Sequence, residues 1–267
     1  MKTAIVVTRP GRKIRLSKID PDSTAGVTKE EALERVAELG ETLNVLQETF
    51  YAEHRRGILI IFQAIDTGGK DGSIKNLCRG FNPAGVRIAS FKTPTQIELD
   101  HDFLWRVHKA TPAKGMIGIW NRSHYEDVLI ARVHHLVKKK VWKARYEQIN
   151  AFEKILTDNG TTILKFMLHI SKDEQMRRLQ ARIENPKKQW KFSPADLRER
   201  SLWDDYQDAY QDAIRKCNTK WAPWYIVPAD HKWYRNWMVA RTIVEKLESM
   251  NPKYPPPQTD LSQIRIK

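Results

Sequence analysis

The chain has 267 residues, of which 41% are hydrophobic, enough for one substantial buried core. Its 46 Lys and Arg exceed its 32 Asp and Glu by 14, so we expect a polyanionic partner: nucleic acid, an acidic membrane or a phosphate-rich substrate. The sequence contains no apolar run long enough to span a bilayer and no helix-turn-helix, zinc-finger or RNA-binding aromatic motif.

Two further expectations concern partners and compartment. Cys78 and Cys217 have neither metal-ligand spacing nor the pattern of a disulfide framework, which is typical of a reducing cytoplasm. The sequence shows no signal peptide, so we expect a cytoplasmic protein without a membrane partner. The basic residues are interspersed with acids, which argues against nucleic acid, although charge alone leaves that class open.

In chain order, a basic arm is expected over residues 1–27, and helical spacing of apolar residues then predicts a helix over 28–56. Thr28 is its expected N-cap, with Glu31 as capping-box partner. Apolar segments separated by helical stretches predict an α/β fold of three α/β/α layers, resembling phosphate-loop kinases, with five parallel strands. The expected strands are 58–63, 86–91, 115–120, 161–170 and 224–228.

A helical hairpin with a basic tip is expected over about 173–214, inside a domain that covers 28–250. Its first helix carries Arg177, Arg178 and Arg182 and is broken by Pro186, and its second helix runs over 193–214. After the fourth strand of such a fold, this hairpin is interpreted as a lid that closes over phosphates; a solvated hairpin packed on the sheet is the alternative. The tail 251–267, which is rich in proline, is expected to be extended.

Lys70 lies in a glycine-rich turn between the first strand and a helix, which is typical of a phosphate-binding loop. The pattern G-x-x-x-x-G-K-[ST] would need glycine at Ala64 and a hydroxyl at Asp71, so a carboxylate, Asp66 or Asp71, must take over the hydroxyl's role at Mg²⁺. An ordinary tight turn is the alternative. The expected phosphate-binding residues are Thr67, Gly68, Gly69, Lys70, Asp71, Gly72, Ser73, Lys75 and Arg79.

A second group of polar residues follows the strand at 115–120. Asn121 stands at the strand end, where phosphate-loop kinases often have an acid, so the charge for a metal must come from Glu126 and Asp127. Arg122 has the planar fork that suits phosphate oxygens.

The motifs Q-A-x-D-x-x-G-K-D-G-S-I at 63–74 and N-R-S-H-Y-E-D-V at 121–128 together resemble the polyphosphate kinase 2 family. The Glu-Asp pair at 126–127 points to class III within it. The resemblance covers residues 28–250 and implies an enzyme that transfers phosphoryl groups between inorganic polyphosphate and nucleoside mono- and diphosphates. ATP-dependent phosphorylation of a nucleotide or small molecule is the alternative activity, and a basic nucleic-acid-binding protein is the alternative from another class.

The expected reaction assigns a role to each residue of the site. Mg²⁺ is the expected cofactor, and a homo-oligomer, dimer or tetramer, is expected from Trp and Leu on the terminal helices. A basic track of Lys75, Arg79, Lys187 and Lys188 is expected to carry the donor chain away from the loop. The expected roles are donor binding by Lys70, metal binding by Asp66 and Asp127, contact with the transferred group by Arg122 and Arg178, and acceptor binding by Asn121, Arg122, Glu126, Asp127, Arg178 and Arg182.

Overall fold

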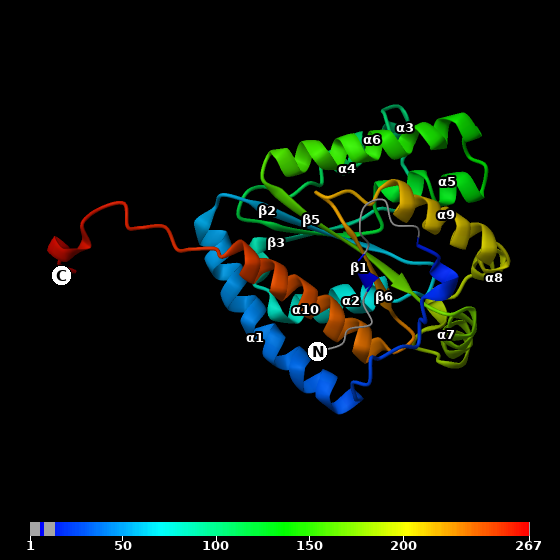
Figure 1. Ribbon diagram of the computed structural model, residues 1–267, viewed down its shortest axis with the longest axis horizontal. Helices are drawn as coiled ribbons and strands as arrows, with labels where there is room; N and C mark the ends of the chain where they lie inside the picture. The colour runs from blue at the N-terminus through cyan, green and yellow to red at the C-terminus, as the bar shows by residue number, and fades with distance from the viewer. Residues whose placement is uncertain (1–5, 8–13, 267) are drawn as a thin grey trace.

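One six-stranded sheet with the order β1-β6-β5-β2-β4-β3 forms the centre of the computed structural model, which describes residues 6–7 and 14–266 (Figure 1). The five predicted parallel strands are confirmed. A short β1 (Val6–Val7), too short to show any alternation in the sequence, was not predicted and pairs antiparallel with β6. The parallel strands are β2 (Gly57–Gln63), β3 (Val86–Ser90), β4 (Ile117–Asn121), β5 (Thr161–His169) and β6 (Trp224–Pro228).

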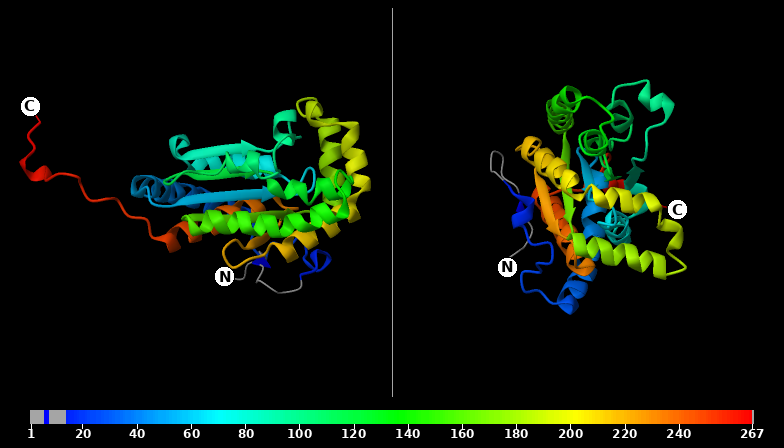
Figure 2. Two further views of the ribbon diagram at one scale, coloured as in Figure 1. Left: turned by 90° about the horizontal axis from the view of Figure 1, so that it is seen from above. Right: turned by 90° about the vertical axis from the view of Figure 1, so that its right-hand side faces the viewer.

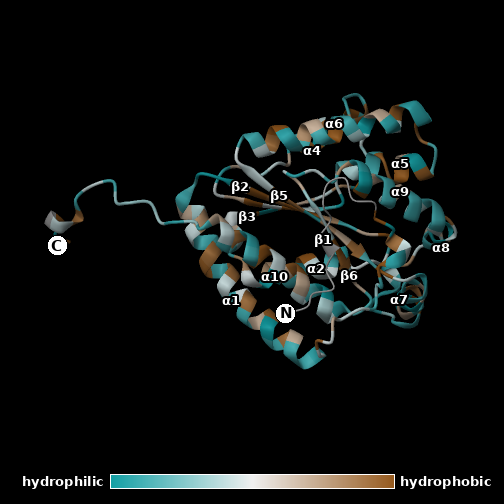
Figure 3. Ribbon diagram, in the orientation of Figure 1, coloured by the Kyte–Doolittle hydropathy of each residue, from teal (hydrophilic) through white to brown (hydrophobic). Residues whose placement is uncertain are grey.

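The central strands are continuous apolar runs because helices cover both faces of the sheet. Every residue of β2 is buried, and Figure 3 shows β2 and β5 largely brown. In the register of the sheet, Phe62 lies opposite Asn121 on β4 and Phe166 on β5. The carboxyl ends of these strands therefore lie side by side, which is where open parallel sheets place their ligands.

Helices α1 (Lys29–Glu53), α2 (Lys70–Leu77) and α10 (Lys232–Met250) cover one face, and α6 (Lys139–Asp158) covers the other (Figure 1). The predicted capping box is confirmed, since the Thr28 hydroxyl accepts from the Glu31 N–H and the Glu31 carboxylate accepts from the Thr28 N–H. Three short helices complete the connections: α3 (Gln96–Leu99), α4 (Trp105–His108) and α5 (Ile130–Val133).

After β5 the chain forms α7 (Lys172–Glu184), α8 (Pro194–Ser201) and α9 (Trp203–Lys216). The prediction of one continuous helix over 193–214 was wrong, because the chain bends at Leu202. α8 buries no side chain, whereas α9 begins with buried Trp203 and packs into the core, so the bend separates an exposed helix from a core helix. Figure 2 shows α7 and α8 at the end of the sheet toward which the strand arrows point.

The chain ends leave this body in different ways. Residues 251–266 extend away from the domain beyond α10 (Figures 1 and 2). Most of the predicted basic arm, residues 1–5 and 8–13, lies outside the described residues, as does residue 267. Across residues 6–7 and 14–266, the structure contains no helix that is both long and apolar enough to cross a membrane.

Candidate active site

The turn between β2 and α2 has a backbone that requires glycine at Gly69. Gly69 lies at φ +97°, in a region of backbone conformation that residues other than glycine rarely adopt, and Thr67 lies at φ +64°. A Cβ on Gly68 would come within 2.8 Å of the Ile65 carbonyl oxygen. The chain can therefore turn sharply from the strand into α2, with backbone N–H groups of the turn near the helix N-terminus.

Lys70 is buried inside this turn. Its ammonium donates to the Ala64 carbonyl at 2.9 Å. Burial lowers the pKa of Lys70, while the Asp66 carboxylate opposes the shift. The hydroxyl oxygens of Thr67 and Ser73 are also buried, and neither has a hydrogen-bond partner among the described residues. The loop thus holds a desolvated cation and two available hydroxyls, which suits a polyanion.

A second turn, after β4, is attached directly to the loop. Arg122 lies at φ +63°, and its N–H donates to the Phe62 carbonyl at 3.0 Å. Its guanidinium lies 3.5 Å from the Asp66 carboxylate, and the Asn121 amide donates to Asp71 at 2.7 Å. Two segments that are distant in sequence therefore present Asp66, Asp71 and Arg122 to one site.

Glu126 and Asp127, although adjacent, face different surroundings. Burial raises the pKa of Glu126, and the positive charges of Arg122 and Lys70 oppose this shift. Glu126 therefore lies close enough to the loop to interact with its charges. Burial also raises the pKa of Asp127, but the charges that oppose it are Arg145, Arg106 and His124. Asp127 forms an ion pair with Arg145 at 3.0 Å.

The structure consequently does not bring Asp127 together with Asp66, although both were predicted metal ligands. Asp66 lines the pocket described below and Asp127 does not. On the short 3-10 turn His124–Asp127, neighbouring side chains point in different directions, so adjacency in sequence did not place both carboxylates at the loop.

A buried polar network supports the Arg122 turn from behind. The Lys165 ammonium donates to Glu153 at 2.6 Å, to the Tyr125 hydroxyl at 2.9 Å and to the Cys217 carbonyl at 2.7 Å. The Tyr125 hydroxyl donates to Glu153 at 2.9 Å, and His124 lies 3.4 Å from the same carboxylate. Because Tyr125 and His124 belong to the turn, this network fixes the position of Arg122 and Glu126.

Helix α7 is tied to the loop by Arg178. Its guanidinium donates to the Thr67 carbonyl at 3.0 Å and to the Ala229 and Asp230 carbonyls at 2.6 and 3.1 Å. Glu174 accepts from it at 2.6 Å. Most Arg178 donors are therefore used within the protein, and its first effect is to position α7 against the loop.

A pocket of about 1120 Å³ opens over the loop and is strongly basic. Ten Lys and Arg side chains line it against four carboxylates. The cations are Lys70, Lys92, Arg122, Arg177, Arg178, Arg182, Lys188, Lys191, Lys232 and Arg235, and the acids are Asp66, Asp71, Glu174 and Asp196.

The pocket includes one residue of the expected basic track, Lys188, and not Lys187. Lys75 and Arg79 are exposed on and just after α2 and lie outside the lining. Sequence reasoning missed Lys232 and Arg235 instead. The available signal was position, because α10 begins directly after β6, whose carboxyl end lies at the same edge of the sheet as the loop.

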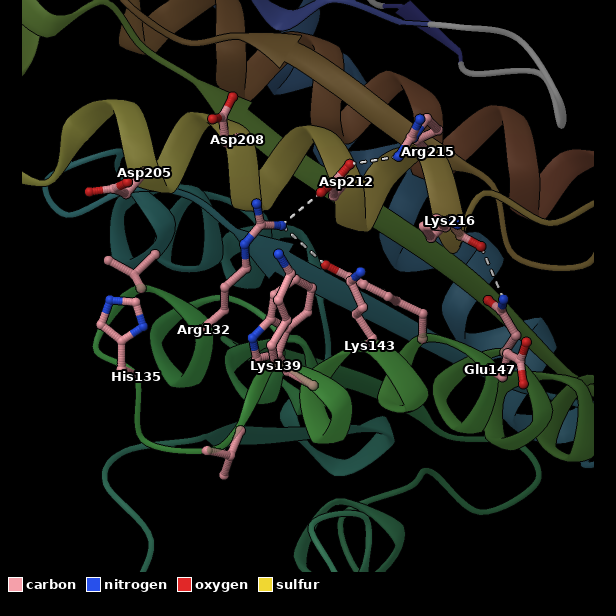
Figure 4. A pocket seen from close by; sticks show the side chains of 15 residues that line it. Arg132, His135, Lys139, Lys143, Glu147, Asp205, Asp208, Asp212, Arg215 and Lys216 are labelled. Carbon is pink, nitrogen blue, oxygen red and sulfur yellow. Dashed lines mark hydrogen bonds and ion pairs between the residues drawn. The ribbon is translucent and has the colours of Figure 1, made fainter.

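A second hollow of about 880 Å³ lies between α5, α6 and α9 (Figure 4). Its charges are nearly balanced, with five Lys and Arg against four Asp and Glu. Several of them pair with one another, as Arg132 does with Asp212 at 2.8 Å and Arg215 with Asp212 at 2.9 Å (Figure 4). The positive charge of the pocket above the phosphate loop therefore favours binding of a polyanion, whereas the nearly balanced charge of this hollow does not.

A parallel α/β sheet, a glycine-rich turn with a buried lysine, and a basic helical segment over it define a phosphotransferase of the phosphate-loop kinase type. The chain belongs to the polyphosphate kinase 2 family, whose model matches residues 26–255. The resemblance noted from the two sequence motifs is thereby confirmed.

Known relatives cover almost the whole chain. An AMP/ADP-polyphosphate phosphotransferase of Meiothermus ruber is 52% identical over 261 residues, which are 97% of this chain and 98% of the relative. An ADP-polyphosphate phosphotransferase of Rhodopseudomonas palustris is 44% identical, over 92% of this chain and 89% of the relative. The crystal structure of polyphosphate kinase 2 from Arthrobacter aurescens superposes with a TM-score of 0.92 at 44% identity, covering 94% of this chain and 91% of that one.

Proposed function

We propose that this protein transfers a terminal phosphoryl group from inorganic polyphosphate to AMP and ADP, forming ADP and ATP. The observation that carries the proposal is the positive charge around the loop, where ten cations line the pocket against four carboxylates. A nucleotide pair brings only a few phosphates, whereas a long phosphate chain offers one negative charge or more for each of these cations. The names of the relatives point to the same substrates.

The protein's part in the reaction is positioning and charge neutralisation, since phosphoryl transfer needs little covalent chemistry from the enzyme. Lys70 and the loop N–H groups hold the donor end, with Thr67, Gly68, Gly69, Gly72 and Ser73 as the surrounding loop. Arg122 contacts the transferred group. The carboxylates of Glu126 and Asp66 outweigh the effect of burial and raise the pKa of Arg122, so its guanidinium stays charged.

Asn121 and Glu126 face the acceptor. Arg178 and Arg182 act from the lid side: Arg178 holds α7 to the loop, and Arg182 donates to the Lys191 carbonyl at 3.3 Å and pairs with Asp196 at 3.4 Å. Closing this helical segment over the phosphates excludes water from the reaction. The proposed lid therefore works through the contacts of α7 and not through one free arginine.

The metal in this proposal is Mg²⁺, held at Asp66. Mg²⁺ binds through one or two carboxylates together with substrate phosphates and water, so it does not need a protein cage. The carboxylate of Asp66 is 36% exposed and lines the phosphate pocket, which fits such a site. When bound, the ion supplies positive charge to the phosphate oxygens. Asp127 remains a proposed ligand only for a conformation in which its ion pair with Arg145 is broken.

Three expectations from the sequence stay predictions: a homo-oligomer, a cytoplasmic location, and the division into arm, kinase-like domain and tail. ATP-dependent phosphorylation of a nucleotide remains the second activity to test, because a phosphate loop accepts either donor.

A donor and acceptor matrix tests the function. AMP and ADP are each incubated with Mg²⁺ and either polyphosphate or ATP, and the nucleotides are separated by chromatography. We expect product from both acceptors with polyphosphate. Product from AMP with ATP, and none with polyphosphate, would establish the ATP-dependent alternative.

A further inference from the structure

Arg235 reaches the phosphate loop from the far end of the sequence. It lies in the first turns of α10, and the residue is 2% exposed. A Cβ on Gly69 would overlap its guanidinium, and a Cβ on Gly72 would lie 3.2 Å from its Nη2. The two glycines therefore let the guanidinium contact the loop, and all three residues line the same pocket.

This buried charge has no counter-charge. Its side chain donates only to the neighbouring Asn236 oxygen, at 2.8 and 3.2 Å, and no carboxylate pairs with it across the described residues. Burial and the adjacent Arg178 lower the pKa of Arg235 to about 9, so the group is still charged at neutral pH. Buried arginines are normally paired, because an unpaired charge in a desolvated site is destabilising.

The neighbours of Arg235 add positive charge. Burial lowers the pKa of Lys232, and Arg178, Lys188 and Arg235 lower it further, while Glu174 is the single acid that opposes them. Lys232, Lys188 and Arg178 line the pocket as well. On the α10 side of the loop the protein therefore gathers four cations, of which only Arg178 pairs with a described carboxylate, that of Glu174, so a bound anion would relieve the repulsion that remains.

We propose that Arg235, with Lys232 and Arg178 beside it, is a binding subsite for phosphate groups of the donor chain. The inference rests on the proposed function and adds a direction: the oligophosphate leaves the loop toward α7 and α10, not along Lys75 on α2 and Arg79 just after it. The planar fork of Arg235 holds two phosphate oxygens at once, which an ammonium cannot do.

The test uses Arg235→Met in the full-length protein, with tripolyphosphate and AMP as separate probes in calorimetric titration. We expect the affinity for tripolyphosphate to fall at least tenfold and the affinity for AMP to change less than twofold. The melting temperature without ligand should be unchanged or higher, since an uncompensated buried charge has been removed. Arg235→Lys should give an intermediate affinity.

Arg241→Met is the matched control, because Arg241 lies on the same helix, is partly exposed and pairs with Glu245. It should leave tripolyphosphate affinity unchanged. Unchanged tripolyphosphate affinity in Arg235→Met, or a loss confined to AMP, would overturn the proposal. If Arg235→Met does not fold, the proposal is decided by Arg235→Lys, whose affinity must then fall with its melting temperature retained.

Turnover of the wild-type protein separates this inference from the function itself. Wild-type ATP formation from polyphosphate together with full tripolyphosphate binding by the variant would overturn the subsite and leave the function in place. If the wild type shows no turnover but its tripolyphosphate binding depends on Arg235, the subsite stands and the proposed function is overturned.

Discussion

Replacing Lys165 with methionine should strongly destabilise the protein, because this change leaves Glu153 as a buried carboxylate without its cation. Both side chains are fully buried, and their charged atoms lie 2.6 Å apart. Breaking a buried pair by removing one partner costs ~3–5 kcal/mol of unfolding free energy. The Cys217 carbonyl also loses its 2.7 Å donor, which adds ~1 kcal/mol or more. The expected loss, roughly 4–6 kcal/mol, is a large part of the ~5–15 kcal/mol typical of a domain.

The destabilisation should depend on pH. Burial alone raises the pKa of Glu153, but Lys165 and His124 outweigh it and hold the pKa below the ordinary 4.5. In the wild type this lowered pKa contributes stability that is present above pH 4.5 and is lost as the pH falls through the folded pKa. Without Lys165, burial raises the pKa of Glu153, so the carboxyl takes up a proton at mildly acidic pH. The loss should therefore be smaller at pH 5 than at pH 8.

Urea unfolding followed by tryptophan fluorescence at pH 5 and pH 8 measures both effects. Lys154→Met is the control, since Lys154 forms an exposed ion pair with Asp158 from the same helix as Glu153 and should cost less than ~1 kcal/mol. The double variant Lys165→Met with Glu153→Leu should recover at least half of the loss. A Lys165→Met variant within ~1 kcal/mol of wild type, or an equal loss at both pH values, would show that the buried Glu153 carboxylate does not depend on Lys165.

Three other predictions test the loop. Gly69→Ala combines φ +97° with overlap of Arg235, so it should lower stability by ~1–3 kcal/mol and abolish measurable turnover in a coupled ATP assay. Arg178→Lys should lower the unfolding free energy by ~2–4 kcal/mol as well as kcat, because three carbonyl bonds are lost; Arg177→Lys, at an exposed position paired with Glu174, should change neither. Asp66→Asn should reduce kcat at least ~10²-fold at ordinary Mg²⁺ while the melting temperature stays within a few degrees, and wild-type activity would remove Asp66 from the metal site.

The parts of the fold that sequence predicted are those that local patterns encode. The apolar run of β2, the Thr28 capping box and the glycine-rich turn around Lys70 each depend on residues that are close in sequence. The bend at Leu202 was not predictable in this way. Residues on both sides favour helix, and only the burial of Trp203 against the core, a tertiary effect, separates α8 from α9.

The site shows the same division between local and tertiary information. Asp66 and Arg122 come together because parallel strands end at one edge, which the strand pattern predicts. Arg235 approaches Gly69 from the opposite end of the chain, and no short motif marks it. Likewise, only the packing of Asp127 against Arg145 shows that Glu126 is the member of the pair that faces the loop.

The proposed function depends on transfer of a phosphoryl group from polyphosphate to a nucleotide, and ³¹P NMR follows that transfer in a single reaction. The reaction contains the protein, ADP, long-chain polyphosphate and Mg²⁺, with no other phosphate donor. We expect an ATP γ-phosphate signal that grows as polyphosphate is lost, and the same growth of ADP signals when AMP replaces ADP. Unchanged polyphosphate, in a sample that phosphorylates AMP once ATP is added, would contradict the proposed function.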